Sequence, residues 1–134
     1  ITMMDIIEHV TDPVAILEKL YKCLTPGGKL VVFTPNHASS VVLIARSLEK
    51  IGLKFAVQEI FGCNHVCFFD DRTLPAAMKK AGFQVDSVWK YPYDPRRPGQ
   101  KISIPGLMMA TAADWLGYPF GAVFRMVHYA HKPE

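Results

Sequence analysis

The sequence predicts an α/β fold in which strands and helices alternate around a mostly parallel sheet. One observation is the run Leu30–Phe33, which is apolar at every position, as is typical of a strand buried on both faces. A second is residues 12–24, where apolar side chains recur every three or four positions, as on one face of a helix. A short apolar run at residues 1–4 precedes this helix, so strand, helix and strand follow one another as a βαβ unit.

Composition limits the class of protein. Of the 134 residues, 50% are hydrophobic and 20% charged, so we expect one domain over residues 1–134, with an apolar insertion at about residues 99–120. The net charge of +3 comes from scattered Lys and Arg side chains rather than a basic stripe, which argues against nucleic acid binding. Three cysteines without the spacing of a disulfide framework favour a reducing compartment, and we expect a cytoplasmic location.

Strong local signals bound the first helix. Asp12 is a favourable N-cap residue, and Pro13 suits the first helical position, where a backbone N–H would have no helical partner. The Pro-Gly-Gly run at residues 26–28 ends the segment. We expect one buried apolar stripe on this helix.

The second helix follows the central strand after a short turn. Residues 34–36, Thr-Pro-Asn, close the strand, and either Ser39 or Ser40 is suited to cap a helix that continues through Ile51. Gly52 is placed as its C-terminal stop.

A third helix is expected over residues 73–81, ended by Gly82. We take Thr73 as its N-cap, because this choice leaves Pro75 in the first turn, where no helical hydrogen bond is lost.

Two further strands are predicted. In residues 83–91 apolar positions, Trp89 among them, alternate with polar ones, which indicates a strand with one wetter face near the sheet edge. Residues 91–99 are expected to form a loop, and the apolar residues after them a short helix. Residues 123–131 are the last strand candidate.

The stretch Ile102–Phe124 is unusually apolar. Asp114 is its only charged residue, but prolines and glycines interrupt it, so no integral membrane span is predicted. Two interpretations remain open. In one, the stretch is an interfacial helix, preceded by the basic cluster Arg96, Arg97 and Lys101, that makes peripheral contact with a membrane and collects a lipophilic substrate. In the other, it is buried against the sheet, a homo-oligomer face or further polypeptide.

Residues 1–13, ITMMDIIEHVTDP, resemble the fourth strand and following loop of class I S-adenosylmethionine-dependent methyltransferases, especially the branch with the ubiquinone-biosynthesis O-methyltransferases. Residues 24–30, LTPGGKL, resemble the entry to the family's fifth strand, and residues 34–36 its exit. Residues 65–83, with HVxFF, then a leucine and KAGF, resemble the segment that leads into the sixth strand. Because these motifs occur in the family's order, the resemblance covers residues 1–91.

The resemblance implies a Rossmann-like class I methyltransferase sandwich of three layers, incomplete here, from strand four to an antiparallel strand seven. It also implies methyl transfer from S-adenosylmethionine to a small-molecule acceptor, with O-methylation favoured over transfer to nitrogen or carbon. The family's Gly-x-Gly-x-Gly turn and the acidic residue that holds the cofactor ribose lie upstream of the resembling segment, so we expect this chain to be inactive alone. The alternative is a methyltransferase-like module that serves as a non-catalytic scaffold or interaction partner.

Candidate site residues follow the strands, because ligands of open α/β sheets bind beyond the carboxyl ends of the strands. The resemblance places Met4 where the family contacts the cofactor, with Asp5 beside it; a core methionine is the alternative for Met4. His9 is the candidate general base, since an imidazole accepts a proton near neutral pH, and Glu8 is its catalytic neighbour. Alternatively, Glu8 and His9 brace the turn before Asp12.

Further candidates lie on the substrate side. Asn36 and His37 follow the next strand, where they are placed to hydrogen-bond an acceptor, although Asn after Pro is also a common turn residue. His65 resembles a residue of the loop that covers the family's site.

Two groups of residues raise the question of a metal ion. The motif at residues 63–67, Cys-Asn-His-x-Cys, supplies at most three ligands and no fourth partner at zinc-like spacing. Asp5, Glu8 and His9 resemble part of a divalent-ion site that some quinone O-methyltransferases use. We predict no metal site and keep the second group as the alternative.

Overall fold

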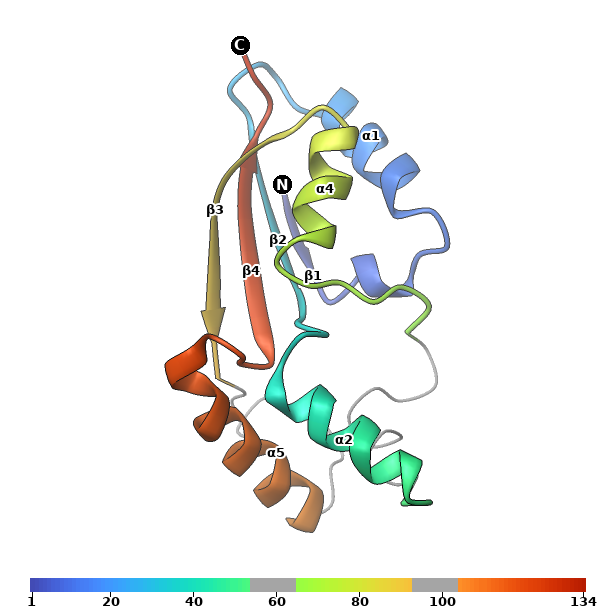
Figure 1. Cartoon of the computed structure of the whole chain (residues 1–134). Coiled ribbons are helices and arrows are strands. Elements are labelled where there is room, and N and C mark those ends of the chain that lie inside the picture. Colours follow the sequence, from blue (N-terminus) through green and yellow to red (C-terminus); the bar gives the residue numbers. More distant parts are fainter. Residues whose placement is uncertain (54–64, 93–103) are drawn as a thin grey trace.

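The structure is a computed structural model that describes residues 1–53, 65–92 and 104–134 (Figure 1). The predicted alternation of strands and helices is confirmed. The elements, in chain order, are β1 (Thr2–Met4), η1 (Ile7–His9), α1 (Pro13–Cys23), β2 (Lys29–Pro35), α2 (Ser40–Lys50), α4 (Thr73–Lys80), β3 (Gln84–Tyr91), α5 (Ile104–Gly117), η2 (Tyr118–Phe120) and β4 (Arg125–His131).

The described strands form one sheet in the order β1-β2-β4-β3. β1 pairs with β2 in parallel, whereas β4 is antiparallel to both β2 and β3. The last strand is therefore antiparallel and inserted beside β3, as the resemblance implies. The carboxyl ends of β1, β2 and β3 and the start of β4 lie at the same end of the strands (Figure 1). We call this end of the sheet the carboxyl edge, as distinct from the edge strands β1 and β3.

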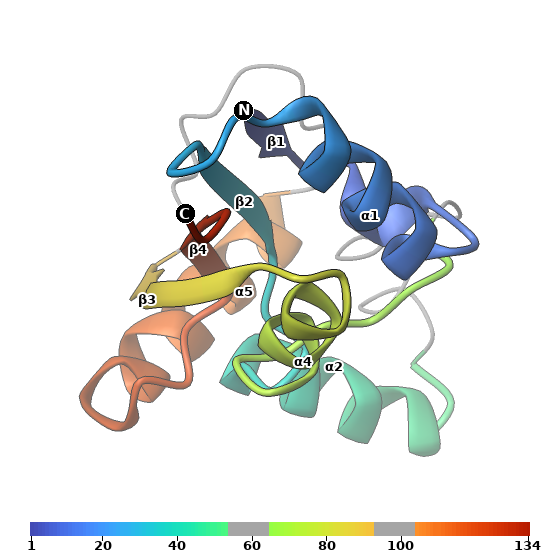
Figure 2. The ribbon, with the colours of Figure 1, turned by 90° about the horizontal axis from the view of Figure 1, so that it is seen from above.

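Helices α1 and α4 lie side by side against one face of the sheet (Figures 1 and 2). The core under them is built from apolar side chains of every strand and of both helices, and includes Met3, Leu17, Leu30, Val32, Leu74, Met78, Phe83, Met126 and Ala130. On the opposite face several large side chains stay exposed, among them Met4, Trp89 and Tyr129. One face of the sheet is thus closed and the other accessible within the described residues.

The capping signals of the first two helices operate as predicted. Asp12 Oδ1 accepts a hydrogen bond from Ala15 N at 2.9 Å, and α1 begins at Pro13. Ser39 is the cap of α2, since its Oγ accepts from Val42 N. The Ser40 hydroxyl has another task, because it reaches carbonyl oxygens of the α5–β4 segment.

The predicted cap of the third helix was wrong. Thr73 is the first residue of α4, and the capping side chain is Asp70, whose Oδ1 accepts from the N–H groups of Thr73 at 2.7 Å and Arg72 at 2.9 Å. Pro75 still falls in the first turn, where helical N–H groups have no carbonyl partner. The acidic residue satisfies those groups from two positions upstream of Arg72.

The edge position of β3 is confirmed, but its alternation changes partway. The ladder to β4 shifts register between Val85 and Ser87, as a β-bulge does. A shift by one residue exchanges the two faces of a strand. Val85 therefore packs against the core while Trp89, predicted on the drier face, is 67% exposed.

A second apolar cluster joins α2 to α5 beyond the carboxyl edge. Val41, Val42 and Phe124 pack there against Ala110 and Ala113 of α5. The predicted short helix after the loop is confirmed as α5, and only its small-residue side is covered. In the described ranges, no helix has both the length and the apolar content needed to cross a membrane.

Candidate functional site

The chain turns sharply where β1 ends at the carboxyl edge. Asp5 adopts φ +49°, in the left-handed region that is uncommon for residues other than glycine, although Asp tolerates it better than most. Its N–H donates to Phe33 O at 3.0 Å, which extends the contact between β1 and β2. This turn directs the chain into η1, so Glu8 and His9 stand immediately beyond the strand end.

Glu8 is the buried member of this group, with 2% of its surface exposed. Its Oε2 accepts a hydrogen bond from Thr34 Oγ1 at 3.0 Å, whereas Oε1 is buried and accepts none from the described residues. The Glu8 carbonyl oxygen accepts from Val66 N at 2.9 Å and Cys67 N at 3.0 Å. These backbone bonds hold the segment before α4 against η1.

That segment brings His65 to His9. The two imidazole rings meet edge to face with their centroids 4.8 Å apart. One ligand atom each from Glu8, His9 and His65 lies within 4.8 Å of the others. A buried carboxylate oxygen without a hydrogen bond and two imidazole nitrogens suit a divalent transition metal, so these three residues could hold a cation. The grouping includes His65 in place of Asp5, which the sequence had suggested.

Burial shifts the ionisation of the cluster. It raises the pKa of the Glu8 carboxyl above its usual value, even though the peptide N–H and Thr34 hydrogen bonds favour the charged form. Burial lowers the pKa of His65, and its electrostatic interaction with His9 lowers it further. The lowered pKa favours the neutral imidazole of His65, which is the form that accepts a proton or binds a metal ion.

The other predicted site residues are placed differently. Met4 is 52% exposed at the end of β1, on the accessible face of the sheet. Asn36 is buried and uses its amide within the fold, donating to Val123 O at 2.9 Å and accepting from Ala38 N at 3.0 Å. His37 is half-buried with its ring 4.5 Å from that of Phe68, and burial lowers its pKa to about 4.

Arg125 is a site residue that sequence reasoning missed. Its Nη1 donates to Asp5 Oδ1 at 2.5 Å, joining residues 120 positions apart. Nothing local in the sequence indicates this contact, because it depends on β4 inserting between β2 and β3. The available signal was a cation near the start of the strand candidate Val123–His131, directly after two apolar residues.

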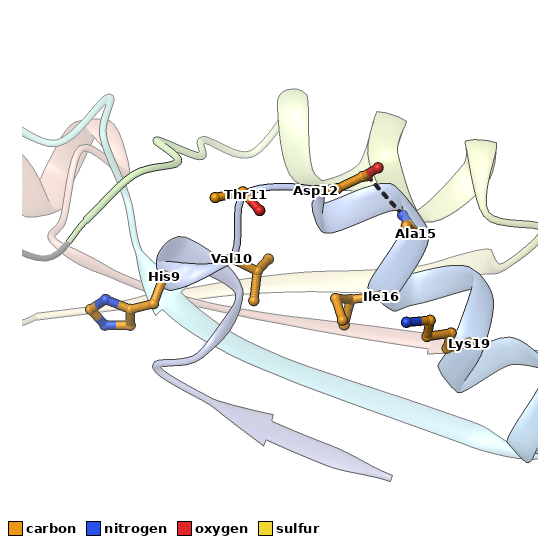
Figure 3. Close-up of a pocket in the computed structure, with 7 residues that line it drawn as sticks. All are labelled: His9, Val10, Thr11, Asp12, Ala15, Ile16 and Lys19. Carbon is orange, nitrogen blue, oxygen red and sulfur yellow. Dashed lines mark hydrogen bonds between the residues drawn. The ribbon is translucent and has the colours of Figure 1, made fainter.

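A shallow hollow of about 380 Å³ lies beside η1 and the start of α1 (Figure 3). Figure 3 shows His9 at one end of it and Ile16 and Lys19 at the other, with Asp12 occupied in capping Ala15. The hollow thus adjoins the contact between His9 and His65. Farther from His9, its lining includes the apolar residues Val10, Ala15 and Ile16.

Comparison with known proteins decides the family. A family described as a methyltransferase domain matches residues 1–88 of the 134. The chain belongs to the methyltransferase domain family. The ubiquinone biosynthesis O-methyltransferase of Xanthomonas euvesicatoria pv. vesicatoria (strain 85-10) is 31% identical over 120 residues, which are 88% of this chain and 46% of that enzyme. The chain therefore spans about half the length of the curated relatives it matches, and the predicted resemblance to this branch is confirmed.

Solved structures confirm the predicted class I methyltransferase fold, of which this chain is a part. A possible histamine N-methyltransferase from Thermotoga maritima aligns with a TM-score of 0.61 at 20% identity, over 98% of this chain and 54% of that one. The [4+2]-cyclase SpnF aligns with a TM-score of 0.55 at 14% identity, over 98% of this chain and 48% of that one. Because a cyclase shares the fold, the fold alone does not fix the reaction of a methyltransferase-domain chain.

Proposed function

We propose that the protein containing this chain transfers a methyl group from S-adenosylmethionine to a hydroxyl oxygen of a small aromatic acceptor. The observation that carries the proposal is the cluster of Glu8, His9 and His65 at the carboxyl edge of a methyltransferase-family sheet. Curated relatives that match most of this chain are named O-methyltransferases, which favours oxygen as the acceptor atom.

Each residue of the cluster has a role in this reaction. S-adenosylmethionine, when bound, supplies an electrophilic methyl group on a sulfonium. His9 accepts the hydroxyl proton of the acceptor, and His65, whose lowered pKa favours the neutral imidazole, is positioned beside it as a second acceptor of hydrogen bonds. Glu8 braces η1 through Thr34 and the segment that carries His65. Methyl transfer then needs mainly alignment of the oxygen with the sulfonium.

Cofactor and acceptor approach from different strand ends in this proposal. Met4 and Asp5, at the end of β1, contact the cofactor. His37, at the end of β2, and His65 contact the acceptor, and Asn36 holds the backbone that carries His37. In an alternative arrangement Glu8, His9 and His65 would hold a divalent cation, His9 would be a ligand rather than the proton acceptor, and the cation would polarise the acceptor oxygen as a Lewis acid.

The test is an assay of the complete protein that contains this chain, with labelled S-adenosylmethionine and a panel of catechols. Replacing His9 by Gln removes the proton acceptor, and we expect kcat to fall about 10²- to 10⁴-fold. His131→Gln, at the opposite edge of the sheet, is the matched control and leaves kcat within twofold. Equal rates for the two variants contradict the assignment of His9.

Calorimetry separates this function from a scaffold role. Binding of S-adenosylmethionine by the complete protein supports catalysis. A complete protein that neither binds S-adenosylmethionine nor methylates any catechol is instead an interaction module, and the proposal fails.

We also propose that α5 and η2 make peripheral contact with a membrane. Their exposed large side chains are Met108, Trp115, Leu116, Tyr118 and Phe120, between 54% and 85% exposed; we call them the α5–η2 surface. Asp114 is turned inward, where its Oδ1 accepts from Phe124 N at 2.7 Å. The outward side of the described part of α5 and of η2 is therefore uncharged and carries Trp and Tyr, the residues favoured at the membrane interface. The basic cluster Arg96, Arg97 and Lys101 lies outside the described residues.

Vesicle sedimentation tests this contact. We expect the protein to pellet with phosphatidylcholine vesicles containing anionic phosphatidylglycerol, and W115S/F120S to weaken binding about tenfold or more, because it removes two interfacial aromatic side chains. Leu43→Ser, at an exposed apolar position of α2, is the control. A protein that stays in the supernatant but forms dimers that W115S/F120S dissociates assigns the surface to a second copy instead.

A further inference from the structure

Arg125 is a buried guanidinium with unused hydrogen-bonding capacity at the carboxyl edge. Its side chain is 8% exposed, and Asp5 is the one acceptor to which it donates among the described residues. A guanidinium carries five N–H donors and stays protonated at any physiological pH. The single bond to Asp5 Oδ1 therefore leaves several charged donors without an acceptor in the described part of the chain.

The surroundings of Arg125 place these donors at the same end of the sheet as the cluster. β4 starts at Arg125, which is paired in register with Pro35 of β2 and Tyr91 of β3. The charge of Arg125 acts on His65, and its Cζ lies 5.7 Å from the Phe124 ring. Among the described residues, the ionisable groups shown to interact with Arg125 are thus Asp5 and His65, and Tyr91 is its neighbour in the ladder of β3 and β4.

We propose that Arg125 binds the acceptor oxygen in its anionic form and thereby promotes its ionisation for methyl transfer. Fixed cationic donors in a site shielded from water stabilise a neighbouring anion far better than they would in water. Phenolate is a much stronger nucleophile than phenol, so lowering the pKa of the acceptor hydroxyl increases the reactive fraction at neutral pH. This inference rests on the proposed O-methylation and adds the residue that holds the nucleophile.

The reaction balances with these groups. The acceptor O–H bond breaks and its proton passes to His9, while the oxygen keeps the electron pair and lies against the Arg125 guanidinium. An oxygen lone pair then forms the bond to the methyl carbon as the carbon–sulfur bond breaks, and its electrons leave with sulfur as a neutral thioether. The product ether is uncharged, so its attraction to Arg125 is lost and release is favoured.

Asp5 moderates this effect, and that gives the proposal its sharpest test. The carboxylate partly neutralises the guanidinium, so removing it exposes more positive charge to the acceptor. Asp5→Asn should therefore lower the pKa of a bound phenol, whereas Arg125→Gln should raise it. If the Asp5–Arg125 pair served only to hold β1 and β4 together, both substitutions should shift the pKa of the bound phenol in the same direction.

The experiment uses 4-nitrocatechol, whose visible absorption reports its ionisation, bound to the complete protein. We expect the wild-type protein to lower the apparent pKa of the bound probe by about one unit relative to free probe. Asp5→Asn should increase this lowering, R125Q should abolish it, and R125K should retain part of it. Lys132→Gln, which removes a cation just beyond the other end of β4, should leave it unchanged. A melting curve for each variant checks that it folds, and R125K and D5N carry the test if R125Q does not.

The outcomes separate this inference from the proposed function. If the probe is not bound as the anion by the wild-type protein, or if R125Q keeps the wild-type shift, the inference is overturned even where catechols are methylated. If the shift follows the predicted signs but no methyl transfer occurs, the anion site stands and the proposed reaction fails.

Discussion

Polar groups are used in opposite ways at the carboxyl edge and at the other end of the strands, which we call the opposite edge. At the edge where β2 begins, Gly27 N donates to Lys132 O and Lys132 N to Gly28 O, both at 2.9 Å. The Lys132 ammonium donates to Tyr21 O at 3.1 Å and Leu24 O at 2.8 Å, which satisfies the last carbonyls of α1. Every one of these polar groups is used to close the fold.

The carboxyl edge holds polar groups that the fold leaves partly unused. Asp5 has a left-handed backbone, the Glu8 carboxylate is buried with one oxygen lacking a hydrogen bond, and Arg125 engages a single acceptor in the described chain. Such arrangements reduce stability, and they are typical of sites built for a ligand. The contrast supports the proposal that the reactive site lies at the carboxyl edge, while the opposite edge serves to stabilise the fold.

The largest expected effect concerns the acid sensitivity that His128 of β4 confers on the fold. His128 is fully buried without a hydrogen-bond partner in the described chain, and burial lowers its pKa to about 4. The unfolded chain binds a proton below pH 6.5 and the folded chain only near pH 4. The contribution of His128 to stability is therefore complete above pH 6.5 and falls by about 3 kcal/mol as pH drops to 4.

Denaturant unfolding of this chain between pH 4 and 8 measures that loss. His128→Leu should flatten the profile by about 3 kcal/mol, because the buried imidazole of His128 is then no longer there to resist protonation. Tyr129→Phe, at a partly exposed position of the same strand, should keep the wild-type slope. A wild-type profile without an acid limb, or one that His128→Leu leaves intact, contradicts this account.

A matched pair of glycines tests the packing of the two edges. A Cβ on Gly117 would lie 2.0 Å from Ser40 Oγ and 2.5 Å from Ala122 O, so Gly117→Ala should push α5 from α2 and cost about 2 kcal/mol. At the opposite edge Gly27 has φ +73° and open space around a Cβ. Gly27→Ala should therefore cost only the backbone strain, about 1 kcal/mol. Equal unfolding free energies for the two variants would show that the α2–α5 contact is loose.

Whether a feature of the fold could be predicted from the sequence depends on how far apart in the sequence the residues that form it lie. The caps at Asp12 and Ser39 act within three residues, and the sequence identified both positions, the second as one of two alternatives. The bulge before Ser87 depends on pairing with β4, and the Asp5–Arg125 bond joins the two ends of the chain. Periodicity and capping rules carry no information on such contacts.

The candidate site shows the same division. Glu8 and His9 lie a few residues after the end of β1, so the sequence alone could place them beyond a strand end. His65 is brought to His9 by two backbone hydrogen bonds to Glu8 O. Because these bonds involve no side chain, the residue types in the sequence do not indicate them. The Asn36 amide was interpreted as substrate-facing, whereas the structure shows it bonded to Val123 O and Ala38 N; its substrate role stays untested.

Substitution of Glu8 should increase the stability of the fold and decrease methyl transfer. Glu8→Gln removes a buried charge, and we expect unfolding at pH 8 to require about 1 kcal/mol more while methyl transfer by the complete protein declines. Because burial raises the Glu8 pKa, the folded state holds its proton more tightly than the unfolded state does. The stability gap between variant and wild type should thus grow as pH rises above 4.5 and vanish in acid.

Exposed Glu18 on α1 supplies the control for this substitution. Glu18→Gln should change stability by less than about 0.5 kcal/mol at any pH. If Glu8→Gln is destabilising at pH 8, the carboxylate is stabilised by a partner and the proposed division between the two edges weakens.

The smallest effect tests the opposite edge itself. Lys132→Gln removes two charge-assisted hydrogen bonds to the end of α1 and the contact of the ammonium with the Tyr21 ring, 4.7 Å away. We expect a loss of about 1 kcal/mol, measured by denaturant unfolding, and a faster amide exchange confined to the last turn of α1. Lys22→Gln, an exposed cation in that same turn, should cost less, because its charge interacts with the helix end through water. If Lys132→Gln instead changes ionisation of a phenol bound at the carboxyl edge, the two ends of β4 are electrostatically coupled, and the functional separation of the edges is lost.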